Sequence, residues 1–381
     1  MDAVVARAGR IFLDFSMGHA LSECCLSMID CARPTVTNGL PSECSRQEAR
    51  QNKELGSIHD STETDVTLGA APTAGITRRA VLTRAGAFAA FGVPHALAQS
   101  AAGVHRFRVG TAEICVIADG TMTLPAAFAL PDEAATEVAA MLTANRLPAD
   151  AITNAVNVAI VKTGTDVILI DTGAGTDFMP SLGRFADAFD LSGFKAEDIT
   201  KVIFTHAHPD HFWGIIDPLD DGTRFPAAAH FMSAIEFETW IAADVETRVS
   251  GPFKATAQGT HRRLKSIAER IVTRRPGDEI APGVVLIDTP GHTPGHVSVL
   301  VGAGADRILI GGDVLTHSIV SFQKPAWRWG PDMEPERAVV SRKRTLDMLA
   351  TERLPLLGYH MPWPGVGRVE RKANAYRYVA A

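Results

Sequence analysis

The chain lacks any concentration of positive charge. Its 381 residues include 37 Lys and Arg against 43 Asp and Glu, for a net charge of −6, and the basic residues are scattered along the sequence. Proteins that bind nucleic acid usually gather basic residues in one stripe or patch, so we expect no nucleic-acid partner. With 46% hydrophobic and 21% charged residues, the composition is that of an ordinary globular protein with one large or two small domains.

Cysteine is scarce and unevenly placed. Four of the five cysteines lie within residues 1–70, namely Cys24, Cys25, Cys31 and Cys44. This segment is polar and has no sustained periodicity, so we expect residues 1–70 to be disordered or not translated, with the true start nearer Val66 or Leu68. A zinc cluster is the alternative, but the adjacent pair Cys24-Cys25 does not match the usual Cys-x-x-Cys spacing.

Residues 71–98 have the three parts of a twin-arginine export signal. The pair Arg78-Arg79 precedes the short apolar run 85–93, and the small-residue sequence Ala96-Leu-Ala98 follows it. The run is too short to anchor the chain in a bilayer, and a buried helix is the alternative. We predict cleavage after Ala98, a mature domain over residues 99–381 without a membrane anchor, and a periplasmic or secreted protein. Its one remaining thiol, Cys115, is expected to be buried and inert.

A cluster of histidines stands after one apolar run. The run Val202–Phe204 leads into His206-Ala-His208-Pro-Asp210-His211, which places three imidazoles and a carboxylate within six residues. Both side-chain types bind zinc well, so His206 and His208 are expected to converge on one ion while Asp210 and His211 point to a second. A histidine-rich polar loop is the alternative, but four such side chains after a buried strand favour metal.

Three more apolar runs end in the same way. The runs are Val284–Asp288, Leu309-Ile310 and Leu356-Leu357, and the side chains that follow them are His292 and His296, then Asp313, then His360. Loops at strand ends converge on one edge of a sheet, so we expect these side chains to join the first cluster.

In this order the motifs resemble those of the metallo-β-lactamase superfamily of binuclear hydrolases. The resemblance covers roughly residues 104–381 and implies an α/β fold, a four-layer αββα sandwich with the site along one edge. It implies that His206, His208 and His292 bind the first metal, that Asp210, His211 and His360 bind the second, and that Asp313 bridges them. It also implies that Asp171 is a buried carboxylate that orients a ligand histidine, and that His296 lies outside the ligand set.

Other segments resemble the methyl parathion hydrolase branch, which is related to the acyl-homoserine lactonases. These segments are Phe107–Pro125, Leu182–Ala186 and Tyr359–Gly367. Members of that branch are exported and hydrolyse organophosphate triesters, aryl esters or lactones, so the resemblance implies cleavage of an ester-type bond. Lactonases carry a tyrosine three residues after the bridging aspartate, whereas this chain has Thr316, which weighs against cleavage assisted by a phenol.

The expected site works through two divalent ions. Zinc is the first expectation, and manganese, cobalt or iron also suit mixed imidazole and carboxylate ligands. A hydroxide shared by the ions would attack a carbonyl carbon or phosphorus, while Asp313 holds the ions together and Asp210 accepts a proton. Three alternatives stay open: β-lactam hydrolysis, thioester cleavage of the glyoxalase II type, and metal binding by a vestigial site. We expect a small-molecule substrate, and a homodimer is left open.

Aromatic residues near the ligands are candidates for the substrate pocket. Trp213 follows His211, and Trp327 and Trp329 lie beyond Asp313, so these three tryptophans are expected to line an apolar pocket beside the metal. The other histidines are expected to take no part: His230 is predicted to pack within a strand, and the surface or rim is predicted for His105, His261 and His317.

Strand and helix patterns alternate along the mature chain. The sequence predicts two hairpins, over residues 107–118 and 156–170, and strands before each ligand segment. Helical patterns cover residues 178–189, 233–243 and 261–271, and a long helix is predicted from Glu334-Pro335 to about Glu352, with proline in its first turn.

Overall fold

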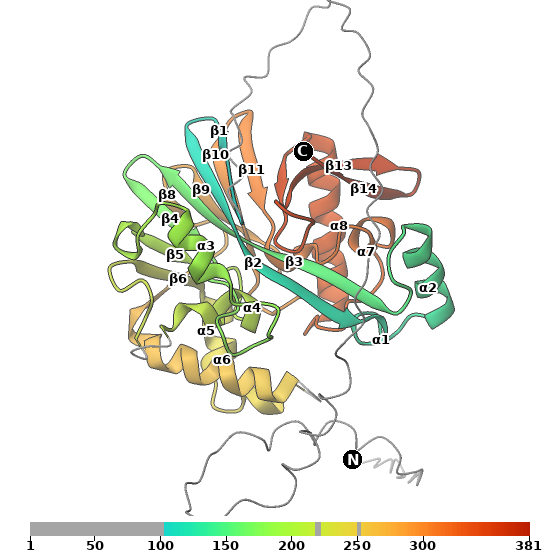
Figure 1. Cartoon of the computed structure of the whole chain (residues 1–381), viewed down its shortest axis with the longest axis horizontal. Helices are drawn as coiled ribbons and strands as arrows, with labels where there is room; N and C mark the ends of the chain where they lie inside the picture. The colour runs from blue at the N-terminus through green and yellow to red at the C-terminus, as the bar shows by residue number, and fades with distance from the viewer. Residues whose placement is uncertain (1–102, 218–221, 250–252) are drawn as a thin grey trace, which may run out of the picture. The chain divides into compact units, whose positions relative to one another are not determined.

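The computed structural model describes residues 103–217, 222–249 and 253–381. The predicted N-terminal extension (1–70) and export signal (71–98) lie outside these ranges. The described part forms two seven-stranded sheets with helices beside them (Figure 1), which confirms the predicted αββα sandwich. No helix in this part of the chain combines the length and hydropathy that a membrane-spanning segment needs.

The first sheet contains the earlier strands in sequence order. These are β1 (Val104–Val109), β2 (Ala112–Pro125), β3 (Ala151–Thr163), β4 (Asp166–Ile170), β5 (Lys201–Ile203), β6 (Ala229–Ser233) and β7 (Ile271–Arg274). Strands β1 to β4 pair antiparallel, which confirms both predicted hairpins, and β4 to β7 pair in parallel.

The second sheet contains the later strands. In spatial order they are β14 (Ala375–Ala380), β13 (Val366–Lys372), β12 (Leu356–Leu357), β11 (Asp306–Ile310), β10 (Val297–Ala303), β9 (Val284–Asp288) and β8 (Glu279–Ala281). Strands β11 and β12 pair in parallel, and the other neighbours pair antiparallel.

Successive residues of one strand face different cores. In β2, Ile114 and Val116 pack between the two sheets, whereas Cys115 and Ile117 face the core under the outer helices. Both faces of each sheet are therefore covered, which explains why the strands appear in the sequence as continuous apolar runs. Cys115 is buried as predicted, and burial raises the pKa of its thiol to about 11.

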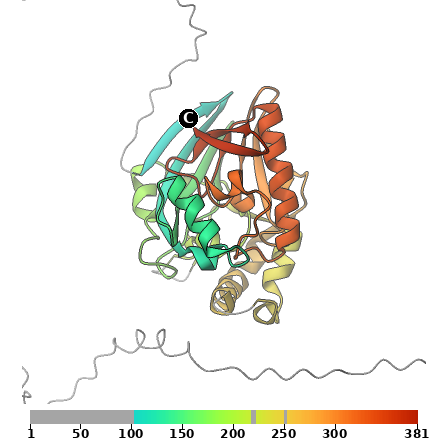
Figure 2. The same cartoon turned by 90° about the vertical axis from the view of Figure 1, so that its right-hand side faces the viewer.

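Helices cover the outer faces of both sheets. On the first sheet lie α1 (Ala126–Ala129), α2 (Ala135–Ala144), α3 (Phe185–Leu191), α4 (Pro209–Phe212), α5 (Ala234–Ile241) and α6 (Phe253–Ile267). On the second sheet lie α7 (Val320–Gln323) and α8 (Pro335–Glu352), and Figure 2 shows α8 running along the side of the sandwich. Helix α8 has the bounds that the sequence predicts.

Two predicted helices have different bounds in the structure. The helix predicted over 178–189 begins only at Phe185, because Pro180 and Gly183 interrupt the preceding segment. Gly183 has a φ of +83°, and a Cβ there would lie 2.3 Å from the carbonyl oxygen of Gly175. The helix predicted over 261–271 begins earlier, at Phe253, and ends at Ile267, since Ile271 already belongs to strand β7.

Candidate metal centre and substrate cavity

Strand ends from both sheets bring the seven predicted ligands together. His206 and His208 follow β5, His292 follows β9, Asp313 lies in the turn Gly312–Val314 after β11, and His360 follows β12, while Asp210 and His211 lie in α4. Their ligand atoms form three overlapping groups, each within 4.8 Å: His206, His208 and His292; His206, His211 and Asp313; Asp210, His211 and His360.

Asp313 lies between the two predicted ligand sets. Its Oδ1 is 3.1 Å from Nε2 of His211, and its Oδ2 is 3.1 Å from Nε2 of His292 and 3.2 Å from Nε2 of His360. Glycine at position 312 allows the backbone turn that places Asp313 between the ligand sets. Its φ is +55°, and a Cβ there would lie 2.7 Å from Nε2 of His296. The carboxylate therefore contacts both halves of the cluster, as a bridging ligand must.

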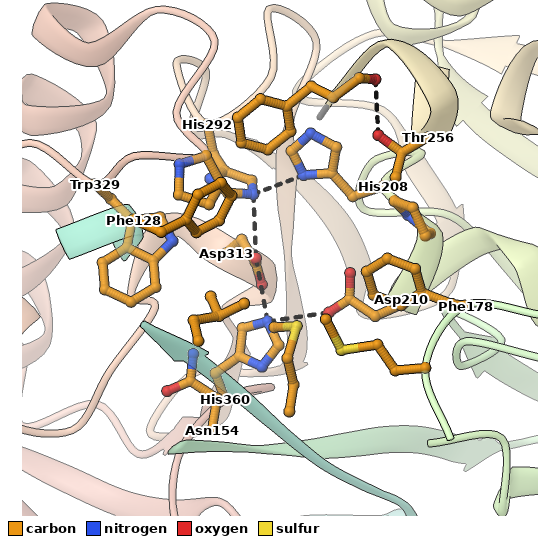
Figure 3. Close-up of a pocket in the computed structure, with 16 residues that line it drawn as sticks. Phe128, Asn154, Phe178, His208, Asp210, Thr256, His292, Asp313, Trp329 and His360 are labelled. Atoms are coloured by element: carbon orange, nitrogen blue, oxygen red, sulfur yellow. Dashed lines mark hydrogen bonds and ion pairs between the residues drawn. The ribbon is translucent and has the colours of Figure 1, made fainter. Parts of the chain in front are cut away.

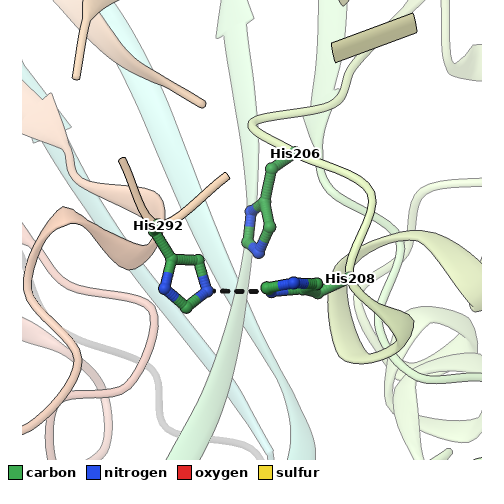
Figure 4. A group of neighbouring side chains, drawn as sticks. All are labelled: His206, His208 and His292. Atoms are coloured by element: carbon green, nitrogen blue, oxygen red, sulfur yellow. Dashed lines mark hydrogen bonds between the residues drawn. The ribbon is translucent and has the colours of Figure 1, made fainter. Parts of the chain in front are cut away.

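The three-histidine group is tightly packed. Nδ1 of His208 lies 2.9 Å from Nε2 of His292, and the ring of His206 lies across from both (Figure 4). The nitrogens that face one another are those that a tetrahedral ion would share.

Four of the histidines are anchored by the ring nitrogen that points away from the centre. Nδ1 of His211 donates to Asp171 at 2.8 Å, Nδ1 of His292 donates to Asp332 at 2.8 Å, and Nδ1 of His360 donates to the carbonyl oxygen of Ala155 at 2.8 Å. Nδ1 of His206 lies 3.1 Å from the hydroxyl of Thr205. Such partners fix the tautomer and orientation of each imidazole and leave Nε2 for a metal ion.

Asp171 lies beneath the centre, where the family resemblance placed it. It is fully buried, and besides His211 it accepts hydrogen bonds from the backbone N–H and the hydroxyl of Thr205, both at 2.8 Å. One carboxylate therefore holds His211 directly and fixes the residue before His206.

Glu236 and Asp332 are functional neighbours that the sequence did not reveal. Glu236, fully buried on α5, accepts hydrogen bonds from the backbone N–H of Ala207 (2.9 Å) and from Thr293 (2.6 Å), and so joins the two loops that carry His206, His208 and His292. Asp332 holds His292 and also pairs with the buried Arg342 of α8 at 3.0 Å. Neither acid belongs to a sequence motif that marks it as a partner of the ligands.

The centre fits a divalent cation. Four of its buried atoms make no hydrogen bond of normal geometry with the described residues: His206 Nε2, Asp210 Oδ2, His211 Nε2 and Asp313 Oδ1. Buried polar atoms are nearly always partnered, and a metal ion satisfies imidazole nitrogens and carboxylate oxygens together.

The electrostatics of the cluster favour the same conclusion. Burial lowers the pKa of His360, but Asp313 and Asp210 beside it outweigh that effect and raise the pKa to about 10. Burial likewise opposes charge on His292, yet Asp313 and Asp332 raise its pKa to about 9. The carboxylates thus gather positive charge around Asp313, which is the charge that a bound cation supplies.

A cavity of about 200 Å³ opens onto this centre. His208, Asp210, His292, Asp313 and His360 form its polar part (Figure 3). Its walls are mainly apolar and include Met122, Leu124, Phe128, Phe178, Met179, Phe253 and Trp329. The structure therefore places Trp329 in the cavity, as the sequence predicted.

Trp213 and Trp327 do not line this cavity, which corrects the prediction for both. The Trp213 indole packs against the Arg263 guanidinium, 4.1 Å from the ring centroid, and donates to the hydroxyl of Thr260 at 2.9 Å. Trp327 is half-buried beneath Lys324, whose Nζ lies 4.8 Å from the ring centroid.

The described histidines outside the ligand set are buried or half-buried in the fold. His296 accepts a hydrogen bond from the Asp313 backbone N–H at 2.9 Å and so positions the bridging residue. His230 is buried in β6 as predicted, and His105 and His261 are half-buried. His317 is only 3% exposed, contrary to the surface or rim position predicted for it, because its Nδ1 accepts from the backbone N–H groups of Ile319 and Val320.

Histidines and carboxylates that cluster at the strand ends of an αββα sandwich are typical of one class of metal-binding proteins. Residues 152–358 match the Metallo-beta-lactamase superfamily, a segment that includes every predicted ligand except His360. The chain belongs to this superfamily.

Curated relatives match part of the chain. The probable metallo-hydrolases Rv2300c of Mycobacterium tuberculosis and Mb2322c of Mycobacterium bovis are each 28% identical over 183 residues, which cover 42% of this chain and 57% of the relative. The chain thus spans little more than half the length of these relatives.

Solved structures match more completely. AidC, a dizinc quorum-quenching lactonase in complex with a product, is 27% identical with a TM-score of 0.69, covering 73% of this chain and 97% of that one. The hydrolase AbOPH of the beta lactamase superfamily is 26% identical with a TM-score of 0.68, covering 74% of this chain and 99% of that one.

Replacing Asp332 with Asn should weaken metal binding, because the neutral amide no longer holds the Nδ1–H of His292 with a negative charge. Loss of such a partner typically lowers metal affinity by about 10- to 100-fold. Zinc affinity is measured by competition with a chelator, and the melting temperature is recorded because Arg342 loses its partner. Asp150→Asn, an exposed change of the same type, serves as the control. Wild-type affinity in folded Asp332→Asn would show that Asp332 does not support the centre.

Proposed function

We propose that the protein hydrolyses an ester-type bond, in a carboxylic ester, a lactone or a phosphotriester, with two divalent ions, zinc first. One observation carries the proposal: seven ligand-type side chains meet beneath a cavity with apolar walls. A small substrate can pack its apolar part against those walls while its polar bond reaches the centre. Complete retention of all seven ligands argues against a vestigial site.

Each residue of the centre has a defined task in this proposal. His206, His208 and His292 would hold one ion, Asp210, His211 and His360 the other, and Asp313 would contact both. When bound, the ions acidify water and stabilise the oxygen that gains negative charge. Asp210 lines the cavity, and its Oδ2 lies 3.3 Å from Nε2 of His360, where it can hold an ion and accept a proton from water.

One of the solved structures supports ester-type chemistry, and the other supports hydrolysis. AidC is described as a dizinc lactonase and AbOPH as a hydrolase, and each is matched over nearly its whole length. Phenol assistance is not part of the proposal: Thr316 is buried with its hydroxyl 3.3 Å from that of Ser321, and no tyrosine occurs among the described residues that line the cavity.

The proposal is tested with zinc-loaded protein and five substrates: an aryl ester, a lactone, a paraoxon-type phosphotriester, S-lactoylglutathione and nitrocefin. We expect turnover of at least one of the first three, lost on chelation and restored by zinc. Turnover confined to nitrocefin or S-lactoylglutathione would replace the proposal with β-lactam or thioester hydrolysis. Absence of turnover for all five would favour a metal-binding role without catalysis.

Replacing Asp313 with Ala should reduce bound metal below two ions per chain, because two neighbouring cations repel each other without a shared anion. Hydrolysis should fall by more than the ~10- to 100-fold loss that is typical when an outer partner is removed. Metal content is measured on the purified protein together with kcat/KM. Asp306→Ala, an exposed change at the start of strand β11, which precedes the turn that carries Asp313, is the control. Two ions and wild-type activity in Asp313→Ala would disprove the bridging role.

We also propose export through the twin-arginine route. The double substitution Arg78→Lys and Arg79→Lys keeps the charge but removes the pair that the export receptor recognises, so protein should accumulate in the cytoplasm. Arg84→Lys, a nearby change of the same type, should leave export unchanged. Fractionation of expressing cells measures the outcome, and periplasmic recovery of the double variant at the wild-type level would contradict this route.

A further inference from the structure

A second cavity, of about 430 Å³, lies apart from the metal centre. Helix α6 and the segments that follow β4 and α4 line it, and no described residue lines both this cavity and the one at the metal centre. Its described lining holds three arginines and one carboxylate, namely Arg224, Arg262, Arg263 and Asp177. The lining therefore carries an excess of positive charge, in a chain whose net charge is negative.

Two of the arginines have donors without a partner. Arg262 is exposed and makes no hydrogen bond or ion pair with any residue that the structure describes. Arg224 is half-buried, and its Nε donates to the carbonyl oxygen of Gly214 at 3.1 Å. The terminal nitrogens of Arg224 make no hydrogen bond with the described residues. The bond from Nε fixes the guanidinium and leaves both terminal nitrogens for a ligand.

The third arginine is held in the cavity wall. The guanidinium of Arg263 packs on the ring of Trp213 and pairs with Asp177 at 2.5 Å. Gly259 permits this packing, because a Cβ at position 259 would lie 2.3 Å from the indole ring. The Asp177 side chain is 66% exposed, so this carboxylate is largely in water and offsets little of the positive charge.

The charges within the cavity also oppose one another. Burial lowers the pKa of the Arg263 guanidinium, and the neighbouring charge of Arg262 lowers it further, although Asp177 opposes both effects. An anion bound between the arginines would reduce this repulsion. Because Arg263 and Arg224 are already held by other contacts, little side-chain ordering is needed when such an anion binds.

We propose that this cavity binds a phosphate group, either as free phosphate or as part of an organic phosphate. Three guanidinium groups against one carboxylate leave two positive charges uncompensated, which match a phosphate dianion better than a single carboxylate. Arginine donors also suit phosphate oxygens, which accept two parallel hydrogen bonds from one guanidinium. Trp213 and Ile216 supply apolar lining beside the arginines, where an organic group could pack. The inference does not depend on the proposed ester hydrolysis.

Calorimetry with inorganic phosphate and with phenylphosphonate tests the proposal on zinc-loaded protein. Zinc can itself bind phosphate, so each titration is repeated after zinc has been removed by dialysis against a chelator. We expect binding with and without zinc. Tighter binding of phenylphosphonate would support a site for an organic phosphate, and tighter binding of inorganic phosphate would support a site for the free ion.

Arg262→Gln should raise the Kd for the tighter probe by about 10-fold, because a hydrogen bond to a charged group is lost. The melting temperature should not change, since Arg262 is exposed and has no described partner. Arg224→Lys keeps the charge but removes the paired donors, so it should also weaken binding. Arg275→Gln, an exposed change of the same type outside the cavity, is the control and should leave the Kd unchanged.

Four results would overturn the proposal. Binding that disappears with zinc would place the phosphate at the metal centre. A wild-type Kd in both Arg262→Gln and Arg224→Lys would exclude the arginines as its partners. Equal weakening by Arg275→Gln would indicate general attraction by surface charge. Absence of binding by either probe up to about 10 mM would show that the cavity is not a phosphate site.

Discussion

The carboxylate of Asp313 is buried among imidazoles, and a buried charge is tolerated only where opposite charge lies beside it. His211, His292 and His360 lie beside the carboxylate and can supply that charge, as bound cations would. Each imidazole can face Asp313 only if its other ring nitrogen has a partner, and the structure provides one in each case. These partners are Asp171, Asp332 and the carbonyl oxygen of Ala155, which the strands and loops around the centre place beside the imidazoles.

The metal centre depends on the contact between the two sheets. Residues 206–211 come from the first sheet and His292 and Asp313 from the second, so the centre exists only when the sheets are correctly opposed. Glu236 strengthens the connection, because its carboxylate binds the loops of both sheets. The same packing of one sheet against the other forms the cavity, whose lining includes Asn154 from β3 and Trp329 from the segment before α8. The cavity and the predicted metal centre therefore depend on one interface between the sheets.

The sequence predicted the ligands because each is marked locally: an imidazole or carboxylate directly follows an apolar run. It predicted both hairpins and α8 for the same reason, since periodicity and turn residues are local signals. It could not place Trp213 and Trp327, because position in the sequence does not determine which neighbours a ring contacts. Trp213 packs on residues of α6 and Trp327 on Lys324, and neither ring lines the cavity. Asp332 and Glu236 were missed because their importance depends on neighbours distant in the chain.

The central claim is that one cluster of seven side chains holds two ions with Asp313 between them. Anomalous diffraction from crystals of the zinc-loaded protein tests it most directly. The account predicts two anomalous peaks, one contacted by His206, His208 and His292 and the other by Asp210, His211 and His360, with Asp313 contacting both. A single peak, or a second peak outside this cluster, would contradict it.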